Sequence, residues 1–278
     1  MKTPLLSFLF FLVIFGACIS DRQPASAVDY SLLVNPFIGT DFTGNTYPGA
    51  QAPFGMVQLS PDNGLPGWDR ISGYYYPDST IAGFSHTHLS GTGAGDLYDI
   101  SYMPVTLPYR EAEAPLGIHS KFRHSDEEAS AGYYRVLLKD YNINVELTAT
   151  ERCGIQRYTF PKAQSAVFLN LKKAMNWDFT QDSHIEVVDS CTIQGYRFSD
   201  GWARGQRVFF RTRFSKPFRS SEIDTTAIIQ DGKTIGTAYV ARFNFDTTDG
   251  EEIVLCTALS GVSMEGAAGN LAAEAPHN

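Results

Sequence analysis

The residues best suited to chemistry gather between positions 83 and 100, in the run GFSHTHLSGTGAGDLYDI. His86 and His88 are two residues apart, so on a strand their side chains would point to the same face. Such a pair can bind a metal ion, donate hydrogen bonds to a hydroxylated ligand, or satisfy itself in a polar part of the core. Because no third residue follows at a clear metal-ligand spacing, we favour polar contacts within a pocket, and a structural role is the next alternative.

A second group of candidates lies in a loop rich in glycine and proline, where Trp68 precedes Asp69 and Arg70. An exposed indole suits a sugar, whose C–H face stacks on the ring while its hydroxyls bond to polar groups such as Asp96. The alternative, which is the commoner case for a lone tryptophan, is that Trp68 anchors the loop on the fold and that the acidic residues form turns. Spacing along the chain does not identify two carboxylates at the separation of about 6.5–9.5 Å that inverting glycoside hydrolysis requires.

The residues around the glycine-rich run at 91–95 exclude a dinucleotide-binding loop. The glycines of GTGAG at 91–95 would need a helix directly after them to bind a dinucleotide, whereas residues 97–102 have the pattern of a strand. The sequence also contains no Ser-His-Asp order, nucleophile elbow or HExxH motif. The glycines are therefore interpreted as turn positions or points of close backbone approach.

The elements that must position these residues are predicted to be antiparallel strands. Residues 142–148 (NINVELT) alternate apolar and polar side chains, as expected for a strand with one buried face. Asp-Gly pairs at 200–201, 231–232 and 249–250 are hairpin signals. Further strand-like segments lie at 133–139, 154–160, 166–171, 183–188, 192–198, 208–214, 233–240, 242–245 and 252–259. Without helices between them, these strands predict an all-β, antiparallel two-sheet β-sandwich and exclude a parallel α/β fold.

Two regions depart from this regular pattern. Residues 35–104 contain long loops, which is where the binding residues of a rigid sandwich are usually found. Residues 261–278 are small and polar, which predicts that a sandwich domain over 30–260 gives way to the start of an interdomain linker at 261–278. Ordinary fraying of a terminus is the alternative for this last segment.

Composition narrows the class of protein. The 278 residues include 22 Lys and Arg against 30 Asp and Glu, which gives a net charge of −8. No basic face is available to follow a phosphate backbone, so nucleic acid is excluded as a partner. Hydrophobic residues make up 43% of the chain and charged residues 19%, which indicates a folded protein rather than a disordered one.

The N-terminus has the pattern of an export signal. Lys2 precedes the apolar run Leu5–Phe15, which is shorter than the roughly 20 residues of a membrane-spanning helix. The small residues Gly16-Ala17 directly before Cys18 are the layout of a bacterial lipoprotein cleavage site.

Residues 1–17 are therefore predicted to be a lipoprotein signal peptide, with Cys18 as the lipidated first residue and 18–29 as a tether. This predicts a lipoprotein of the bacterial periplasm, outer membrane or cell surface, bound to the membrane through its N-terminal lipid. A competing site for an ordinary signal peptidase is present at Ala25-Ser26-Ala27.

Three further cysteines, Cys153, Cys191 and Cys256, lie within strand-like runs. An odd number cannot all pair within one chain, so buried thiols or one disulfide with one thiol are both open. The sequence has no CxxC motif and no Cys/His cluster, so a structural zinc site is not expected.

Five blocks of sequence together resemble glycoside hydrolase family 92. They are residues 34–40 (VNPFIGT), 47–50 (YPGA), 53–62 (PFGMVQLSPD), 72–74 (SGY) and 81–93 (IAGFSHTHLSGTG). The resemblance extends over essentially the whole chain after the export signal and is weakest beyond residue 110. It implies an N-terminal β-sandwich of the supersandwich, galactose-mutarotase-like type, followed by a larger (α/α)₆ barrel, with the active site between the two domains.

The resemblance also implies an activity, because members of the family are calcium-dependent, inverting exo-α-mannosidases. Their general acid, base and most calcium ligands belong to the second domain, so no catalytic residue and no metal ligand is assigned to this chain. The resemblance implies that Trp68, His86, His88 and Asp96 line one wall of the sugar pocket, Trp68 above all. The expected partners are mannose-containing glycans and a C-terminal catalytic domain of the same polypeptide. A stand-alone carbohydrate-binding module without hydrolase activity, or a sandwich that only supports a catalytic domain, are the alternatives.

Overall fold

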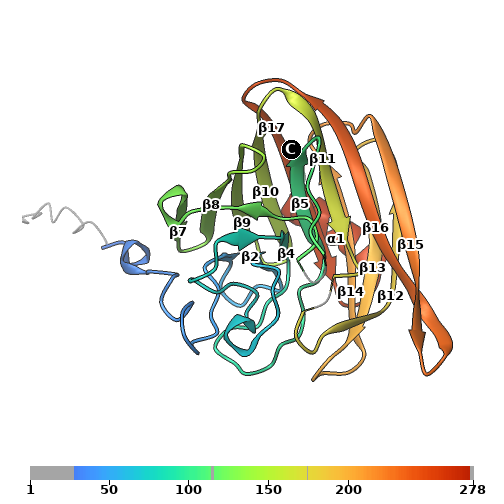
Figure 1. Ribbon diagram of the computed structural model, residues 1–278, viewed down its shortest axis with the longest axis horizontal. Helices are drawn as coiled ribbons and strands as arrows, with labels where there is room; N and C mark the ends of the chain where they lie inside the picture. Colours follow the sequence, from blue (N-terminus) through green and yellow to red (C-terminus); the bar gives the residue numbers. More distant parts are fainter. Residues whose placement is uncertain (1–27, 114–115, 174, 276–278) are drawn as a thin grey trace, which may run out of the picture. The chain divides into compact units, whose positions relative to one another are not determined.

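The computed structural model describes residues 28–113, 116–173 and 175–275. The chain divides into two units after Tyr30, and the fold described below is that of the second unit, which begins at Ser31. Antiparallel strands dominate this unit and form two large sheets (Figure 1), so the predicted all-β sandwich is confirmed. The predicted signal peptide, including Cys18, lies outside the described residues.

One sheet has eight strands and contains most of the strands that sequence analysis predicts. Every pairing in it is antiparallel. Its order is β12 (Phe179–Val187), β13 (Thr192–Asp200), β14 (Gln206–Phe214), β17 (Glu251–Ser260), β10 (Cys153–Phe160), β9 (Ile143–Ala149), β8 (Tyr133–Leu138) and β7 (Glu127–Ser130).

The other large sheet has seven strands and includes the short strands of the loop-rich region. Its order is β1 (Ala50–Gln51), β2 (Gln58–Asp62), β4 (Gly83–Ser85), β5 (Ser101–Thr106), β11 (Ala163–Asn170), β16 (Lys233–Thr247) and β15 (Ser220–Gln230). A separate two-stranded sheet pairs β3 (Thr80–Ile81) with β6 (Ser120–Lys121). The remaining elements are the 3₁₀ turns η1 (Tyr30–Leu33), η2 (Trp68–Arg70) and η3 (His124–Asp126) and the helix α1 (Met264–Glu274).

The hydrophobic core contains side chains from both large sheets. In β9 the predicted alternation is present, because Val145 is buried in the core and Thr148 is exposed. Leu169 of β11 belongs to the same core cluster. A polar contact also joins the sheets, since the hydroxyl oxygens of Tyr102 in β5 and Thr212 in β14 are 2.6 Å apart. The sandwich is therefore a rigid support for the loops at its ends.

The structure differs from the strand predictions in three places. The two segments predicted at 233–240 and 242–245 form the single strand β16. Strand β15 was not predicted; it is a largely exposed edge strand, and its residues lack the alternation that burial of one face produces. Residues 97–100 are loop rather than strand, because Leu97, Tyr98 and Ile100 adopt φ of +84°, +68° and +55° and β5 begins only at Ser101.

The segment predicted as the start of a linker contains the helix α1. Ser263 caps it, since its hydroxyl accepts a hydrogen bond from the backbone N–H of Gly266 at 3.0 Å. Leu271 packs with Cys256 and Ala258 of β17, whose neighbours along the strand, Leu255 and Leu259, belong to the main core instead. The helix therefore covers part of the outer face of the eight-stranded sheet.

Two other sequence expectations can be compared with the described residues. Within the described residues, no disulfide joins Cys153, Cys191 and Cys256 to one another; Cys153 and Cys256 are buried and Cys191 is half-buried. Within the described ranges, no helix has both the length and the apolar character needed to cross a bilayer.

Candidate functional site

Two tryptophans from distant parts of the chain lie side by side at the surface. Trp68 begins η2 and is 57% exposed, and Trp177, which precedes β12, is 46% exposed. Their ring centroids are 6.0 Å apart and the ring planes are tilted by 58°. We call these two residues the tryptophan pair. Two large aromatic side chains left together in solvent indicate a binding surface, and sugars are the ligands that such rings commonly stack against.

The loops that bear the tryptophan pair are joined by hydrogen bonds. The side-chain oxygen of Asn176 accepts from the backbone N–H of Gly67 at 2.9 Å, and its amide donates to the carbonyl of Arg70 at 3.3 Å. The N–H of Trp177 donates to the carbonyl of Gly95 at 3.2 Å. A Cβ at Gly95 would lie 2.6 Å from Cβ of Asn176, so only glycine allows this approach. Hydrogen bonds therefore join the loop of Trp68 and the loop of Gly95 to the segment that contains Trp177.

Asp96 lies next to these loops and holds a third tryptophan. Asp96 is 1% exposed, and its carboxylate accepts hydrogen bonds from the backbone N–H groups of Trp202 at 2.8 Å and Ala203 at 2.7 Å. Trp202, in the connection between β13 and β14, is 78% exposed. The carboxylate thus fixes the loop of an exposed aromatic residue. Direct contact between Asp96 and a substrate stays a prediction.

His86 is fully buried behind the loops. Its Nδ1 lies 2.7 Å from the carbonyl oxygen of Ile100, and its Nε2 lies 3.5 Å from the amide nitrogen of Gln156. Burial lowers the pKa of His86 to about 4, so the ring is neutral at pH 7. Gly154 makes room for it, because a Cβ there would lie 2.5 Å from Cδ2 of His86.

His88 is also buried, and it belongs to a charged network. Its Nδ1 lies 2.7 Å from the carbonyl oxygen of Gln58, and its Nε2 lies 2.9 Å from Oδ1 of Asp62. Nζ of Lys173 donates to the other oxygen of Asp62 at 3.1 Å. Burial alone would raise the pKa of Asp62, but Lys173 and His88 together lower it to about 2. The ring nitrogens of His86 and His88 already face protein groups. Contact of either ring with a substrate stays a prediction.

Three of the buried carboxylates in this region, those of Asp62, Asp96 and Asp99, are engaged by protein donors. Asp62 is bound by Lys173 and His88, Asp96 by backbone N–H groups, and Asp99 by Arg197 at 2.6 Å. None of these three is left with the water access that a catalytic base requires. Among the described residues, no group of three or more His, Cys, Asp or Glu side chains is arranged to hold a metal ion. The arrangement suits binding and orientation of a ligand.

Sequence reasoning missed Trp177, Trp202 and Asn176. A signal for them was present, because all three tryptophans of the chain, Trp68 included, stand in loops beside Gly or Asn. The proximity of Trp68 and Trp177 could not be predicted from the sequence, because the hydrogen bond between Gly67 and Asn176 joins residues 109 positions apart.

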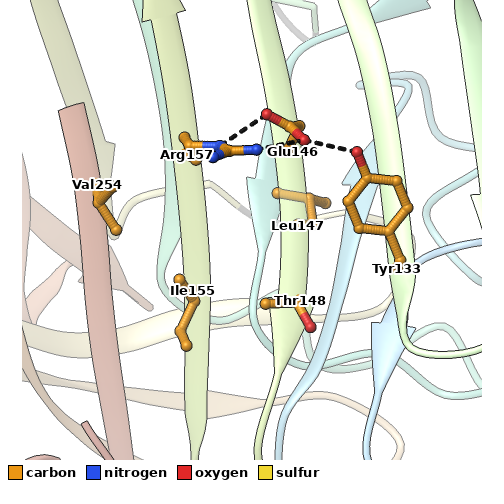
Figure 2. A pocket seen from close by; sticks show the side chains of 7 residues that line it. All are labelled: Tyr133, Glu146, Leu147, Thr148, Ile155, Arg157 and Val254. Carbon is orange, nitrogen blue, oxygen red and sulfur yellow. Dashed lines mark hydrogen bonds and ion pairs between the residues drawn. The ribbon is translucent and has the colours of Figure 1, made fainter. Parts of the chain in front are cut away.

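A hollow of about 280 Å³ lies elsewhere, on the outer face of the eight-stranded sheet. Figure 2 shows the side chains that line it. Arg157 donates two hydrogen bonds to Glu146, at 2.7 and 2.8 Å, and Tyr133 donates a third at 2.6 Å. Ile155 and Val254 supply apolar surface beside this ion pair. Because its charged groups already pair with each other and it holds no exposed indole, we place the candidate site at the tryptophan loops.

Comparison with known proteins identifies a family with this fold. A family model described as the glycosyl hydrolase family 92 N-terminal domain matches residues 33–260. The structure of the family GH92 α-mannosidase BT3965 from Bacteroides thetaiotaomicron is similar with a TM-score of 0.81 and 35% identity, over 89% of this chain and 36% of that chain. The inverting mannosidase BT2199 from the same organism is similar with a TM-score of 0.72 and 25% identity, over 91% of this chain and 34% of that chain.

A curated relative, an uncharacterized secreted glycosidase from Arthroderma benhamiae, is 28% identical over 138 residues, which are 46% of this chain and 17% of the relative. The chain thus spans about a third of the length of these solved structures. The part of the solved α-mannosidases that aligns with this chain has the same β-sandwich fold. The chain belongs to glycosyl hydrolase family 92 and contains the N-terminal domain of that family, which confirms the resemblance found in the sequence.

Proposed function

We propose that this chain is the N-terminal, carbohydrate-binding part of an inverting, calcium-dependent exo-α-mannosidase that trims α-mannosides from glycans. The observation that carries the proposal is the exposed tryptophan pair, Trp68 and Trp177, held on hydrogen-bonded loops. An indole binds the C–H face of a mannose ring, and the edges of the loops offer backbone and side-chain groups to its hydroxyls. The pair would form one wall of the sugar pocket.

Hydrolysis is proposed to require a C-terminal catalytic domain of the same polypeptide. Inversion needs a carboxylic acid that donates a proton to the leaving oxygen and a second carboxylate, about 6.5–9.5 Å from the first, that activates a water molecule. The engaged state of Asp62, Asp96 and Asp99 supports a division of labour in which this chain binds and orients substrate. Both carboxylates and the main ligands for calcium are expected in the second domain.

The test compares two proteins. Residues 18–278 expressed alone should fold as a β-rich protein and leave α-mannosides uncleaved with or without calcium. The complete polypeptide should hydrolyse terminal α-mannose and lose activity when calcium is chelated. Robust, calcium-independent turnover by residues 18–278 would overturn the proposal, because two carboxylates within the sandwich would then perform the reaction.

A stand-alone carbohydrate-binding module is the second candidate, since the tryptophan pair lies wholly within this chain. The same comparison separates the two. A gene whose reading frame stops after Asn278, together with specific binding of mannosides by the chain, would favour the module. A frame that continues into several hundred helical residues would favour the enzyme.

Export and lipid anchoring belong to the same proposal. Its support is the apolar run that ends before Cys18 and the description of the Arthroderma relative as secreted. Acylation of Cys18 should bring the protein into the membrane fraction, and Cys18→Ser should release it or block processing. Mass spectrometry that finds an unmodified mature N-terminus at Val28 would exclude the lipid anchor.

A further inference from the structure

A fully buried arginine lies beneath the tryptophan loops. Arg197 of β13 is 1% exposed. Its Nη1 donates to Oδ1 of Asp99 at 2.6 Å, its Nε donates to the hydroxyl of Thr180 at 3.1 Å, and its Nη2 donates to the carbonyl of Lys173 at 3.1 Å. Nη2 also donates to the carboxylate of Asp178. One guanidinium of β13 thus binds Asp99 and three groups around the start of β12, those of Lys173, Asp178 and Thr180.

Asp99 connects Arg197 to the loop that contains Gly95 and Asp96. Its second oxygen accepts from the hydroxyl of Thr87 at 2.8 Å, and its own N–H donates to the same hydroxyl at 2.9 Å. Asp99 is flanked by Tyr98 and Ile100, both with φ in the left-handed region, at +68° and +55°. Bulky residues rarely adopt this conformation, so the surrounding contacts must impose it.

Asp178 connects Arg197 to the tryptophan pair itself, because it directly follows Trp177. Asn176, on the other side of Trp177, also has a left-handed φ of +55° and binds Gly67, the residue before Trp68. Two short stretches of left-handed backbone, around Asp99 and before Asp178, are therefore both bound to Arg197. In each stretch the bond is made by the carboxylate of the aspartate.

Stability alone does not explain this arrangement. Burying an arginine with two carboxylates removes three charges from water, and apolar residues of similar size commonly stabilise a fold as well or better. In addition, Oδ1 of Asp178 has no hydrogen-bond partner in the described structure. What the network provides that apolar side chains would not is a fixed direction for each loop.

We propose that Arg197, with Asp99 and Asp178, is a positioning group that fixes the geometry of the tryptophan pair. It touches no substrate and acts through the two loops that it joins. The inference rests on the proposed function only for the claim that the fixed pair serves sugar binding; the positioning itself is a property of this chain.

The test uses circular dichroism of the intact chain. Two tilted indoles 6.0 Å apart couple their excited states and give a pair of bands of opposite sign in the far-ultraviolet spectrum. The variants Trp68→Phe and Trp177→Phe, which each remove one partner, define this couplet by difference. Absence of the couplet in the parent chain would contradict the proposal, because the pair would then not be held in one geometry.

Asp178→Asn and Arg197→Lys should each lose the couplet while the strand signal and a cooperative melting transition remain. The matched control is Ile193→Ala, which removes a buried apolar side chain from the same strand, β13, and should keep the couplet despite lower stability. Retention of the couplet in both polar variants would overturn the proposal. Loss in all three variants would overturn it too, since instability alone would then explain the effect. If Arg197→Lys does not fold, Asp178→Asn decides the outcome.

A second readout separates this inference from the proposed function. In the complete polypeptide, Asp178→Asn should raise KM for a terminal α-mannoside about tenfold with little change in kcat, as expected when binding of the substrate and of the transition state is weakened equally. If the couplet disappears but KM does not change, the positioning role stands and the sugar-binding role of the pair is wrong. If the couplet persists, the positioning role is wrong whatever the kinetics show.

Discussion

Asp178, the acidic residue next to Trp177, has a pKa well above its usual range. Burial raises its pKa to about 6, although Arg197 opposes this effect. Since the pKa in the unfolded chain is near 3.8, the folded protein retains a proton between about pH 4 and pH 6 that the unfolded chain has released. This contribution to stability is complete below the lower value and is lost as pH rises through the higher one.

We therefore expect the free energy of unfolding to fall less between pH 4 and pH 6.5 in Asp178→Asn than in the parent chain. The difference should be about 2–3 kcal/mol, from about 1.4 kcal/mol per unit of pKa shift. Urea unfolding at a series of pH values measures it. Parallel pH profiles for the two proteins would show that Asp178 does not titrate in this range.

Lys173 is the cation on which the buried Asp62 depends. Its ammonium group is 3.1 Å from Oδ2 of Asp62, and the two side chains are 11% and 0% exposed. Lys173→Met should destabilise the protein by about 3–5 kcal/mol, because a buried carboxylate loses its charged partner.

A matched control for this prediction is Arg157→Met, which breaks the ion pair with Glu146 shown in Figure 2. Arg157 is 43% exposed, so its loss should change stability by only about 0–1 kcal/mol. Equal effects of the two substitutions in chemical denaturation would contradict the assignment of Asp62 and Lys173 as a buried pair.

At the scale of elements, α1 shows why composition misleads for short helices. Residues 261–278 are mostly small, which is typical of a linker, yet Ala267, Leu271 and Ala275 recur at intervals of four and are buried. Only one large side chain is needed, because small residues on both the helix and β17 allow close packing. A stripe this narrow does not stand out in the sequence.

Leu271→Ala should accordingly destabilise the protein by about 2–3 kcal/mol, at the lower end for a buried leucine since the helix lies at the surface. Val262→Ala, at a site that is 83% exposed just before the helix, is the control and should change stability by less than about 0.5 kcal/mol. Thermal melting of both variants measures the contrast. A segment that behaved as a loose linker would tolerate both changes equally.

The strands were more readable than the helix. The alternation in residues 142–148 and the Asp-Gly pair at 231–232 predicted β9 and the turn between β15 and β16. Asp231 and Gly232 have φ of +50° and +75°, as a two-residue hairpin turn requires. Strand β15 was not predicted because both of its faces are largely exposed, so its sequence does not alternate between apolar and polar residues.

For the molecule as a whole, fold class was predictable and site geometry was not. Periodic strands specify a sandwich locally, whereas the site depends on contacts across the chain, such as Gly67 with Asn176. The same-face argument for His86 and His88 assumed a continuous strand, but β4 ends at Ser85 and both rings enter buried polar networks instead. Trp68 is exposed, as its place in a loop rich in glycine and proline suggested, and its contact with a sugar stays a prediction.

The central claim is that the tryptophan pair forms one wall of a mannoside pocket, and steady-state kinetics of the complete polypeptide test it most directly. Trp68→Ala should lower kcat/KM for a terminal α-mannoside by an amount equivalent to about 1–3 kcal/mol, the scale of one lost stacking contact, with an unchanged melting temperature. Unaltered kcat/KM together with a lower melting temperature would contradict the claim, because Trp68 would then only anchor its loop.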